Sequence, residues 1–243
     1  MLTDHTKDGG FYNIAPKLSP KGDKFAFISN RSDNFDVYLA RTDNGDIEDK
    51  IISGNTTANF EELQILTPGL SWSPDGKQIA ISVKAGDADA IFLVDVNSGD
   101  RVKLPVEMTS ISSVAWSPDK DYVAFIGTNG KESNLYTYNI KTYKVEPLTN
   151  DIFSDANPVW SPDGKSILFN SDRGDYLKKS DVPPDFKISK FDFENRGLYQ
   201  IDVKTKEITK IVSEKGANIN YFQFGKDGKH LLYVSDENGI YNI

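Results

Sequence analysis

The sequence predicts an all-β fold, a β-propeller built from four-stranded antiparallel blades, on three observations. A tight-turn motif recurs five times along the 243 residues, its regular spacing is 44 residues, and each unit contains four short apolar segments separated by turn residues. Five repeats fit into the chain, and the last blade is incomplete. Such small sheets bury both faces only by packing against neighbouring sheets, so we expect one propeller domain over residues 1–243.

The best-formed copy of the motif is Ser161-Pro162-Asp163-Gly164, between the apolar runs Val159-Trp160 and Ile167-Leu168-Phe169. Proline presets φ near −65° at the second turn position, aspartate can accept a backbone hydrogen bond, and glycine tolerates the positive φ that ends the turn. The flanking runs are rich in β-branched and aromatic residues, which favours a hairpin. We expect Trp160 to anchor the core of its blade.

The other copies set the length of the repeat. They are Ser19-Pro20-Lys21-Gly22, Ser73-Pro74-Asp75-Gly76, Ser117-Pro118-Asp119-Lys120 and the degenerate Gly225-Lys226-Asp227-Gly228. Successive offsets are 54, 44, 44 and 64 residues. In the third unit the four strands are expected at Ser113–Trp116, Tyr122–Ile126, Asn134–Ile140 and Lys144–Leu148. The blades then cover approximately residues 11–67, 68–106, 107–150, 151–213 and 214–243.

Two units are longer than 44 residues and contain insertions. We expect the first insertion in the polar stretch Asp43–Glu61, between the third and fourth strands of the first unit. The second falls in Arg173–Arg196, between the second and third strands of the fourth unit, and is called the insert below. In a propeller this connection lies on the same face as the connection between successive blades, so we expect the insert to overhang the mouth of the channel.

The two ends leave closure of the ring open. Tyr241-Asn242-Ile243 stops in a third strand, whereas Leu2-Thr3-Asp4 resembles the end of a fourth strand such as Leu148-Thr149-Asn150. Either the first residues complete the last blade, or the chain is a segment of a longer propeller. We expect the second, because only three or four residues are available to complete the blade.

Composition excludes several classes of function. The net charge of −8 and pI near 4.9 argue against nucleic acid and anionic membranes, which need clustered Lys and Arg. Without cysteine there is no disulfide, thiolate metal site or cysteine nucleophile. The start, Met1-Leu2-Thr3-Asp4-His5, lacks the features of an export signal, and there is no run of 18 apolar residues, so direct membrane insertion is not expected.

The repeat resembles a known family. Trp-Ser-Pro-Asp-Gly-Lys, an aliphatic strand, Ser-Asp-Arg and a Leu-Tyr strand together resemble the WD40-like repeat of TolB-type β-propellers. The resemblance covers nearly the whole chain and is carried by Trp72–Lys77, Trp116–Asp119, Trp160–Lys165, Ser171-Asp172-Arg173, Asn30-Arg31-Ser32 and Leu198-Tyr199. Similar repeats occur in the propellers of prolyl oligopeptidase-type and tricorn-type proteases.

The chain also departs from these relatives. TolB has an α/β domain before a six-bladed ring, whereas this sequence begins directly at a blade and has five repeats. The oligopeptidases carry their catalytic residues on a hydrolase domain after the propeller, and no stretch here resembles one. The resemblance therefore implies a propeller in the bacterial envelope or periplasm, and it transfers fold better than function.

Motifs for catalysis and cofactors are missing from the sequence. It has no Gly-x-Ser-x-Gly, His-Glu-x-x-His, phosphate-binding loop or Gly-x-Gly-x-x-Gly. Of the two histidines, His5 lies near the start and His230 follows the fifth turn, so a serine triad is not expected. The histidine-rich metal site of the similar oligogalacturonate lyases is not matched either. We expect no cofactor and no metal.

Carboxylates keep one catalytic alternative open, a propeller glycoside hydrolase that uses two channel carboxylates. The acids of the turns, such as Asp75 and Asp163, are explained by their structural role. The stretch Asp43-Asn44-Gly45-Asp46-Ile47-Glu48-Asp49 loosely resembles a calcium loop but lacks its full spacing, so we interpret it as a solvated acidic turn.

The insert is the most informative stretch for function, because it combines aromatic and basic side chains with the stiff pair Pro183-Pro184. Such side chains anchor protein interfaces, although they can instead pack the loop onto its own blade. Polar residues of the neighbouring connections should lie beside it at the channel entrance. The candidate partner-binding residues are Arg173, Tyr176, Phe186, Phe191, Phe193, Asp155, Asn157 and Asn220.

The sequence thus favours a non-catalytic TolB-like module that binds a protein or peptide at its channel face, in the bacterial envelope. The alternatives are the glycoside hydrolase and the substrate-gating propeller of a larger protease. The sequence leaves the oligomeric state open.

Overall fold

The computed structural model describes residues 10–54, 62–63, 69–106, 108–187, 191, 195–213, 216–225 and 227–237, and these are almost entirely β-structure. The first two sheets use β1 (Asn13–Leu18), β2 (Lys24–Ser29), β3 (Asp36–Arg41), β4 (Ile47–Ile52), β5 (Glu62–Leu63), β6 (Leu70–Trp72), β7 (Gln78–Ala85), β8 (Ala88–Asp95) and β9 (Arg101–Lys103). The others use β10 (Ser110–Trp116), β11 (Tyr122–Thr128), β12 (Ser133–Asn139), β13 (Lys144–Pro147), β14 (Asp155–Trp160), β15 (Ser166–Ser171), β16 (Gly197–Asp202), β17 (Ile208–Val212), β18 (Ile219–Phe224) and β19 (Leu231–Ser235). A 3₁₀ turn, η1, spans Lys179–Asp181.

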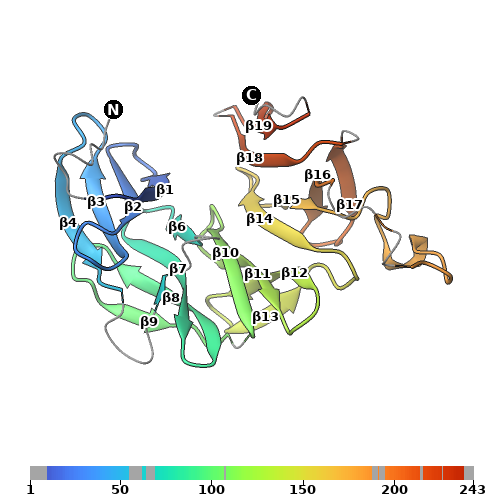
Figure 1. The fold of residues 1–243 in the computed structure, drawn as a ribbon, viewed down its shortest axis with the longest axis horizontal. Coiled ribbons are helices and arrows are strands. Elements are labelled where there is room, and N and C mark those ends of the chain that lie inside the picture. Colours follow the sequence, from blue (N-terminus) through green and yellow to red (C-terminus); the bar gives the residue numbers. More distant parts are fainter. Residues whose placement is uncertain are drawn as a thin grey trace.

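The strands form successive antiparallel sheets, which confirms the predicted propeller-like fold. The first, third and fourth sheets have the orders β1-β2-β3-β4, β10-β11-β12-β13 and β14-β15-β16-β17. In the second, β5 and β6 both pair with β7, which is followed by β8 and β9, and a fifth sheet contains β18 and β19. Figure 1 shows the sheets in an arc in chain order, with β1, β6, β10, β14 and β18 on its inner side.

The first insertion was assigned to the wrong pair of strands: part of the predicted stretch Asp43–Glu61 is β4 itself, and the insertion does not lie between the third and fourth strands. The turn between β3 and β4 is short because Gly45 has a φ of 79° and its N–H donates to the carbonyl of Arg41 at 3.0 Å. The N–H of Asp46 donates to Asn44 Oδ1 at 2.9 Å. The fourth strand therefore starts at Ile47, and the extra residues follow it, between β4 and β6. By contrast, the insert lies between β15 and β16, as predicted.

Each central strand buries both of its faces, which explains the continuous apolar runs. Ile167 and Phe169 of β15 pack in one cluster with Ile126 of the third sheet. Between them in sequence, Leu168 points the other way and packs with Ile219 of the fifth sheet. Because side chains alternate along a strand, one run of apolar residues supplies two interfaces between sheets.

The recurring turn has the predicted geometry and one further feature. Gly164 has a φ of 70°, and its N–H donates to the carbonyl of Ser161 at 2.9 Å. The Ser161 hydroxyl also donates to Asp163 Oδ1 at 2.6 Å and accepts the N–H of Ser166 at 3.0 Å. The same pair of contacts holds the turns at Ser73 and Ser117. The serine of the motif therefore joins the turn to the strand that follows.

One turn is linked to the next sheet by charge. Asp75 forms an ion pair with Lys120 of the third sheet's turn, and it accepts the Ser73 hydroxyl at 2.7 Å. Lys120 and Ser73 lower the pKa of Asp75 from 3.8 to about 2. Since the folded-state pKa lies below the unfolded value of about 3.9, this contribution to stability is complete above that value and is lost as the pH falls toward 2.

We therefore expect Asp75→Asn to be less stable than the wild type at about pH 5, with a difference that shrinks as the pH falls to about 2.5. Urea unfolding of both proteins across this range measures the effect. The control is Asp87→Asn, which changes an exposed acid that has no ion pair among the described residues. A difference between wild type and Asp75→Asn that stays constant with pH would contradict the proposed linkage.

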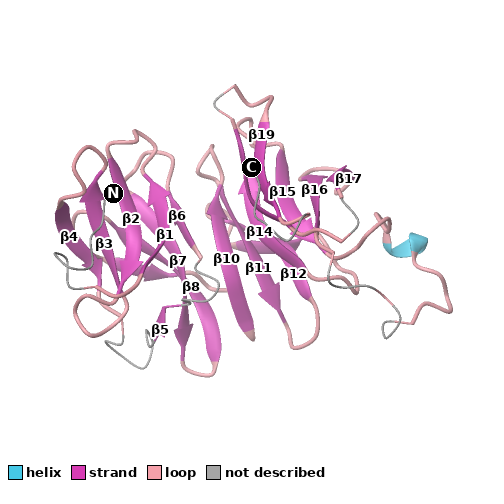
Figure 2. Cartoon of the chain, turned by 45° about the horizontal axis from the view of Figure 1, so that its top comes forward, coloured by secondary structure: helices cyan, strands magenta, loops and turns pink. Residues whose placement is uncertain are grey.

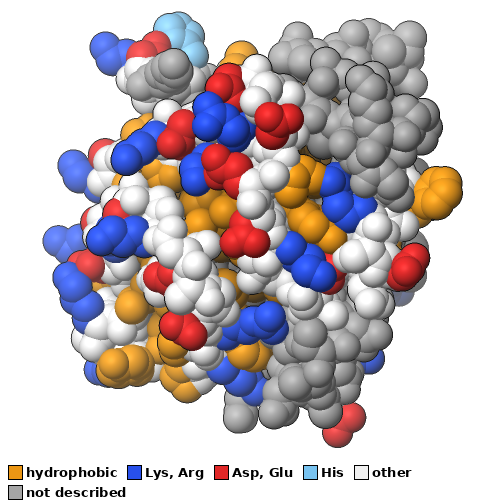
Figure 3. Space-filling model, turned by 90° about the vertical axis from the view of Figure 1, so that its left-hand side faces the viewer, with side chains coloured by type: hydrophobic (Ala, Val, Ile, Leu, Met, Phe, Trp, Pro, Cys, Tyr) orange, Lys and Arg blue, Asp and Glu red, His pale blue; other side chains and the backbone are white. Residues whose placement is uncertain are grey.

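Charges of both signs are mixed on the outer side of the first sheet. Figure 3 shows Lys and Arg interspersed with Asp and Glu there, around hydrophobic side chains. Ion pairs contribute to this mixing, for example Lys24 with Glu48 at 2.6 Å and Arg41 with Asp43 at 2.7 Å. Such a surface does not provide the continuous basic stripe that binds a phosphate backbone.

Candidate functional site

The structure divides the predicted partner-binding residues into three groups. Arg173 and Asp155 lie inside the protein, the aromatic residues Tyr176, Phe186 and Phe191 gather in the insert, and Asn157 and Asn220 belong to the inner strands β14 and β18. Phe193 lies outside the described residues.

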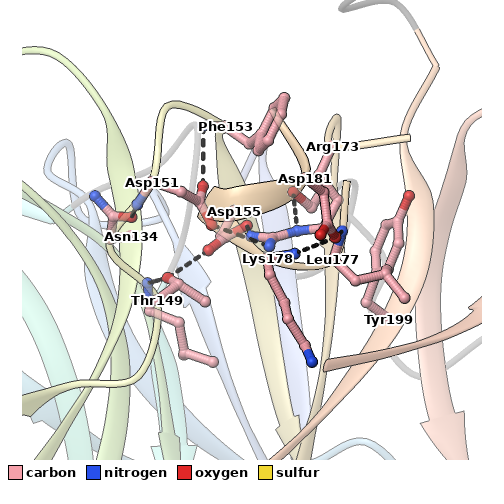
Figure 4. Close-up of polar contacts among 12 residues, drawn as sticks. Asn134, Thr149, Asp151, Phe153, Asp155, Arg173, Leu177, Lys178, Asp181 and Tyr199 are labelled. Atoms are coloured by element: carbon pink, nitrogen blue, oxygen red, sulfur yellow. Dashed lines mark hydrogen bonds and ion pairs between the residues drawn. The ribbon is translucent and has the colours of Figure 1, made fainter. Parts of the chain in front are cut away.

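Arg173 is the centre of the first group and is fully buried, with 0% of its surface exposed. It lies two residues after the end of β15, and its Nε donates to Ser171 Oγ at 3.1 Å. Its Nη1 donates to Asp151 Oδ2 at 3.0 Å, and its Nη2 donates to Asp155 Oδ1 at 2.7 Å. Figure 4 shows the guanidinium directed at Asp155. Two carboxylates, one from the connection before β14 and one from the first residue of β14, therefore hold the start of the insert.

The hydrogen bonds continue into the third sheet. The Thr149 hydroxyl donates to Asp155 Oδ2 at 2.6 Å and accepts the N–H of Leu135 in β12 at 2.8 Å. Asp155 thus uses both carboxylate oxygens, one toward each sheet. The network fixes the connection between the third and fourth sheets from both sides (Figure 4).

Burial and charge act against each other in this network. Burial raises the pKa of Asp155, although the nearby Arg173 counteracts the rise. Burial also works to lower the pKa of Arg173, but Asp155 and Asp151 outweigh it and raise that pKa. The neighbouring Asp172 has a raised pKa because it is buried, while it accepts the N–H of Ser154 at 2.8 Å. The ionised form of Asp155 therefore depends on Arg173.

Aromatic rings surround the guanidinium. Its central carbon lies 5.2 Å from the ring centroid of Phe169 and 5.8 Å from those of Tyr199 and Phe153. Cation–π contacts at such distances stabilise a desolvated arginine. Phe153, which is only 1% exposed, connects this buried charge with the rings of the insert.

Four rings form what we call the aromatic cluster: Phe153, Tyr176, Phe186 and Phe191. Tyr176 stacks on Phe153 with centroids 5.6 Å apart and an interplanar angle of 9°. Phe186 meets Tyr176 edge to face at 5.6 Å, and Phe191 lies 5.2 Å from Phe186 and 5.5 Å from Phe153. The three insert rings are half-buried, so the cluster packs the insert onto Phe153 and still has an accessible side.

The insert does not overhang the channel mouth as expected. Figures 1 and 2 show its described part, with η1, extending beyond β17 on the outer side of the fourth sheet. Asp175 pairs with Lys210 of β17 at 2.7 Å, and the Tyr199 hydroxyl donates to the carbonyl of Gly174 at 2.6 Å. These contacts direct the insert outward from its first residues. Asp181 stabilises its tip by accepting the N–H groups of Leu177 and Lys178 at 3.1 and 2.9 Å.

The third group lines the inner strands. Asn157 Nδ2 donates to Asn170 Oδ1 at 3.4 Å, and Asn170 Nδ2 donates to the carbonyl of Ile219 at 3.1 Å and to Asn220 Oδ1 at 3.4 Å. Asn170 is buried between two sheets, whereas Asn157 is exposed. The three amides join the fourth and fifth sheets at their inner edge.

A bulge places Asn157 in this position. The pairing of β14 with β15 shifts register between Ala156 and Val159, and Asn157 has a φ of 54°. Ala15 in β1 and Tyr221 in β18 lie at the same place in equivalent bulges, with φ of 53° and 49°. Asparagine accepts this left-handed conformation more readily than alanine or tyrosine does. Three of the inner strands, β1, β14 and β18, therefore share a strained position whose side chain varies from sheet to sheet.

Sequence reasoning missed Phe153, Asp151 and Thr149. A signal for the acids was present, because an arginine two residues after the end of β15, whose centre Ile167-Leu168-Phe169 is apolar, needs counter-charges close by. Asp151 and Asp155 are the acids of the segment that enters the same sheet, the first in the connection and the second at the start of β14. Phe153, between them, gave no sequence signal, since a single aromatic in a connection is common.

The other candidate sites have structural explanations. Among the described residues, no group of histidines and acids could hold a metal ion. Asp43, in the stretch compared with a calcium loop, pairs with Arg41, and Glu48 pairs with Lys24. His230 is exposed and contacts Asp227 of its own turn. In the part of the chain that the structure describes, no helix has the length and hydrophobicity to cross a membrane.

Comparison with solved structures shows the same architecture in other proteins. A TolB-type protein of Agrobacterium tumefaciens has a TM-score of 0.61 at 19% identity, over 81% of this chain and 63% of that chain. TolB of Acinetobacter baumannii has a TM-score of 0.65 at 18% identity, over 95% of this chain and 53% of that chain. A prolyl endopeptidase has a TM-score of 0.58 at 17% identity, over 93% of this chain and 32% of that one. No curated protein matches the sequence.

At these identities the structural likeness shows the fold alone, and the chain spans less than two thirds of each of these proteins. The sequence itself carries the family. A model of the TolB beta propeller domain matches residues 55–176, half of the chain, including three of the five turns. The chain therefore belongs to the TolB beta-propeller domain family.

Proposed function

We propose that the chain is a non-catalytic module that binds a protein or peptide partner, with the aromatic cluster as its anchor. The observation that carries the proposal is the construction of this cluster. Tyr176, Phe186 and Phe191 are half-exposed on an insert whose base is fixed by the buried Arg173. Preorganised aromatic side chains on a rigid base are the residues that contribute most to protein interfaces.

The length of the insert supports the same proposal. Connections of more than about 12–15 residues without regular structure are uncommon in compact domains and are often functional. Several interactions stabilise the conformation of this insert, among them the Asp175–Lys210 ion pair and the hydrogen bonds to Asp181. An ordered surface of this kind loses little conformational entropy when a partner binds.

The hydrolase alternative finds less support in this region. A glycosidase needs two carboxylates that reach the sugar, with one of them free to give up a proton. Asp155 is 1% exposed, and both Asp155 and Asp151 are paired with Arg173. These carboxylates are committed to the fold. The likeness to the prolyl endopeptidase propeller is a likeness of fold, so the gating alternative has no observation of its own.

The proposed compartment is the bacterial envelope. It rests on membership of the TolB family and on the bacterial TolB structures that resemble this chain. A partner would then be another envelope protein.

The test is capture of a partner from bacterial envelope extract, followed by titration with the purified partner. We expect Phe186→Ser to weaken the complex by about 30-fold, the effect of losing one interface residue worth about 2 kcal/mol. The matched control is Tyr143→Ser, which removes an aromatic that is 71% exposed on the turn between β12 and β13. Equal loss of affinity in both variants, or in neither, would contradict the proposed position of the site.

A further inference from the structure

The arginine arrangement of the fourth sheet occurs a second time, in the first sheet. Phe27-Ile28-Ser29-Asn30-Arg31 ends β2 as Phe169-Asn170-Ser171-Asp172-Arg173 ends β15. Arg31 Nε donates to Ser29 Oγ at 3.3 Å, and its guanidinium lies 5.4 Å from the ring of Phe27 and 4.8 Å from that of Tyr38. The matching contacts of Arg173 are with Ser171, Phe169 and Tyr199.

The connection that enters the sheet is held in the same way in both places. The N–H of Tyr12 donates to Asn30 Oδ1 at 2.9 Å, as that of Ser154 donates to Asp172 Oδ1 at 2.8 Å. Gly10 is pressed against the motif, since a Cβ at this residue would lie 2.7 Å from Ser29 Oγ. Residues 10–13 therefore correspond to residues 152–155, and Phe11 corresponds to Phe153.

The two sites differ first in charge. Arg173 faces the carboxylates of Asp151 and Asp155, whereas Arg31 Nη2 donates to the neutral Asn13 Oδ1 at 3.4 Å. Across the described ranges, which start at residue 10, no carboxylate is paired with Arg31. Its side chain is half-buried, so the guanidinium combines partial desolvation with access from outside. A carboxylate is the group that binds such a guanidinium best.

The sites differ also in their aromatic cover. Phe153 lies under the rings of the insert and is 1% exposed, whereas Phe11 is 85% exposed and Tyr12 is 59% exposed. The connection between β2 and β3 is short and contributes one ring, Phe35, at 6.2 Å from Tyr12. Within residues 10–54, the first sheet thus presents the base of the arrangement without the carboxylates and rings that complete it in the fourth sheet.

We propose that Phe11, Tyr12, Asn13 and Arg31 form a binding site for a partner segment that carries a carboxylate side chain next to an aromatic one. The carboxylate pairs with the guanidinium of Arg31, as Asp151 pairs with Arg173. The aromatic ring packs on Phe11, as Tyr176 packs on Phe153. This site is separate from the aromatic cluster and does not depend on the function proposed for it.

The probe is the blocked peptide Ser-Asp-Phe-Tyr-Ser, compared with its analogue Ser-Asn-Phe-Tyr-Ser, and binding is followed by NMR on the full-length chain. We expect the acidic peptide to shift the backbone amides of Phe11 and Tyr12 and the Nε–H signal of Arg31. Removal of its charge should weaken binding about tenfold, equivalent to about 1.4 kcal/mol, because the charge-assisted hydrogen bond to Arg31 is lost. Raised salt should weaken the acidic peptide more than the neutral one.

Three variants locate the site. Arg31→Gln should weaken the acidic peptide about tenfold and remove the difference between the peptides, for the same reason. Phe11→Ser, which changes a mostly exposed ring and so leaves the fold intact, should weaken both peptides. Lys131→Gln removes an exposed cation from the corresponding connection of the third sheet and should change neither affinity.

Several results would overturn the proposal. The wild type could bind the two peptides with equal affinity, or bind neither at millimolar concentration. Arg31→Gln or Phe11→Ser could also bind the acidic peptide as tightly as the wild type does. Shifts confined to Tyr176 and Phe186 would assign the peptide to the aromatic cluster instead, and Phe186→Ser separates that case, because the site at Arg31 should not respond to it. Binding that appears only in Asp4→Asn/Asp8→Asn would show that the chain's own acids fill the site.

Discussion

Replacement of Arg173 by methionine is expected to destabilise the protein by about 3–5 kcal/mol, the usual cost of removing one partner of a buried ion pair. Methionine keeps much of the volume and the contacts with the surrounding rings, but it leaves Asp155 ionised and buried beside Asp151. The cost arises mainly from this stranded charge. Urea unfolding of the variant at neutral pH measures it.

The pH dependence separates a stranded charge from lost packing. Burial raises the pKa of Asp155 and Arg173 opposes the rise, so the variant should have a still higher pKa at this carboxyl. A carboxyl whose folded-state pKa exceeds the unfolded value binds protons more tightly in the folded state, so stability improves as the pH falls through that pKa. The deficit of Arg173→Met relative to wild type should therefore shrink on acidification. A deficit that is independent of pH would indicate lost packing.

Two further variants serve as controls. The double variant Arg173→Met/Asp155→Asn removes the stranded charge and should recover at least about 1 kcal/mol. Arg31→Met changes the corresponding arginine of the first sheet, which has no carboxylate partner among the described residues. It should cost no more than about 2 kcal/mol, because it loses cation–π contacts and hydrogen bonds to neutral groups only. Equal losses from Arg31→Met and Arg173→Met would refute the role given to the buried carboxylates.

The sequence determined the fold well because the repeat encodes its information locally. Turn type, hairpin and strand patterning depend on neighbours within about ten residues, and the strands of the third unit were predicted to within three residues at either end. The insertion of the first unit was misplaced for a related reason. Gly45 and Asn44 make a tight turn, but the same residues also fit a loop, and only the pairing of β4 with β3 decides between them.

The site was harder to predict because its contacts join distant parts of the chain. Arg173 was expected at a surface. It is buried instead, because it pairs with Asp151 and Asp155, which lie 22 and 18 residues before it in the sequence. The insert was identified correctly, and its direction was not, because Lys210 of β17 attracts Asp175 from 35 residues away. Spacing within a repeat gives the place of a residue in its blade, whereas direction depends on contacts that the repeat does not contain.

Trp160 is the position where local and distant contacts combine, and Trp160→Ala should destabilise the protein by about 3–5 kcal/mol. The indole is buried between the third and fourth sheets, where it packs with Tyr122 at 6.3 Å. Its Nε1 donates to the carbonyl of Ala115 in the inner strand β10 at 3.0 Å. Trp72 makes the matching bond to Lys17 in β1 at 2.8 Å, so this hydrogen bond recurs between neighbouring sheets. Urea unfolding measures the loss.

The variant Trp160→Phe separates the hydrogen bond from burial, since phenylalanine fills most of the space and cannot donate. Its matched control is Trp116→Phe, because the Trp116 indole is equally buried but donates within its own turn, to the carbonyl of Lys120, at a long 3.4 Å. We expect Trp160→Phe to cost about 1 kcal/mol more than Trp116→Phe, the net worth of one neutral hydrogen bond plus the carbonyl left unpaired. If the two variants lose the same free energy of unfolding, the tryptophans stabilise the packing of neighbouring sheets by burial alone, and the hydrogen bonds between sheets add no measurable stability.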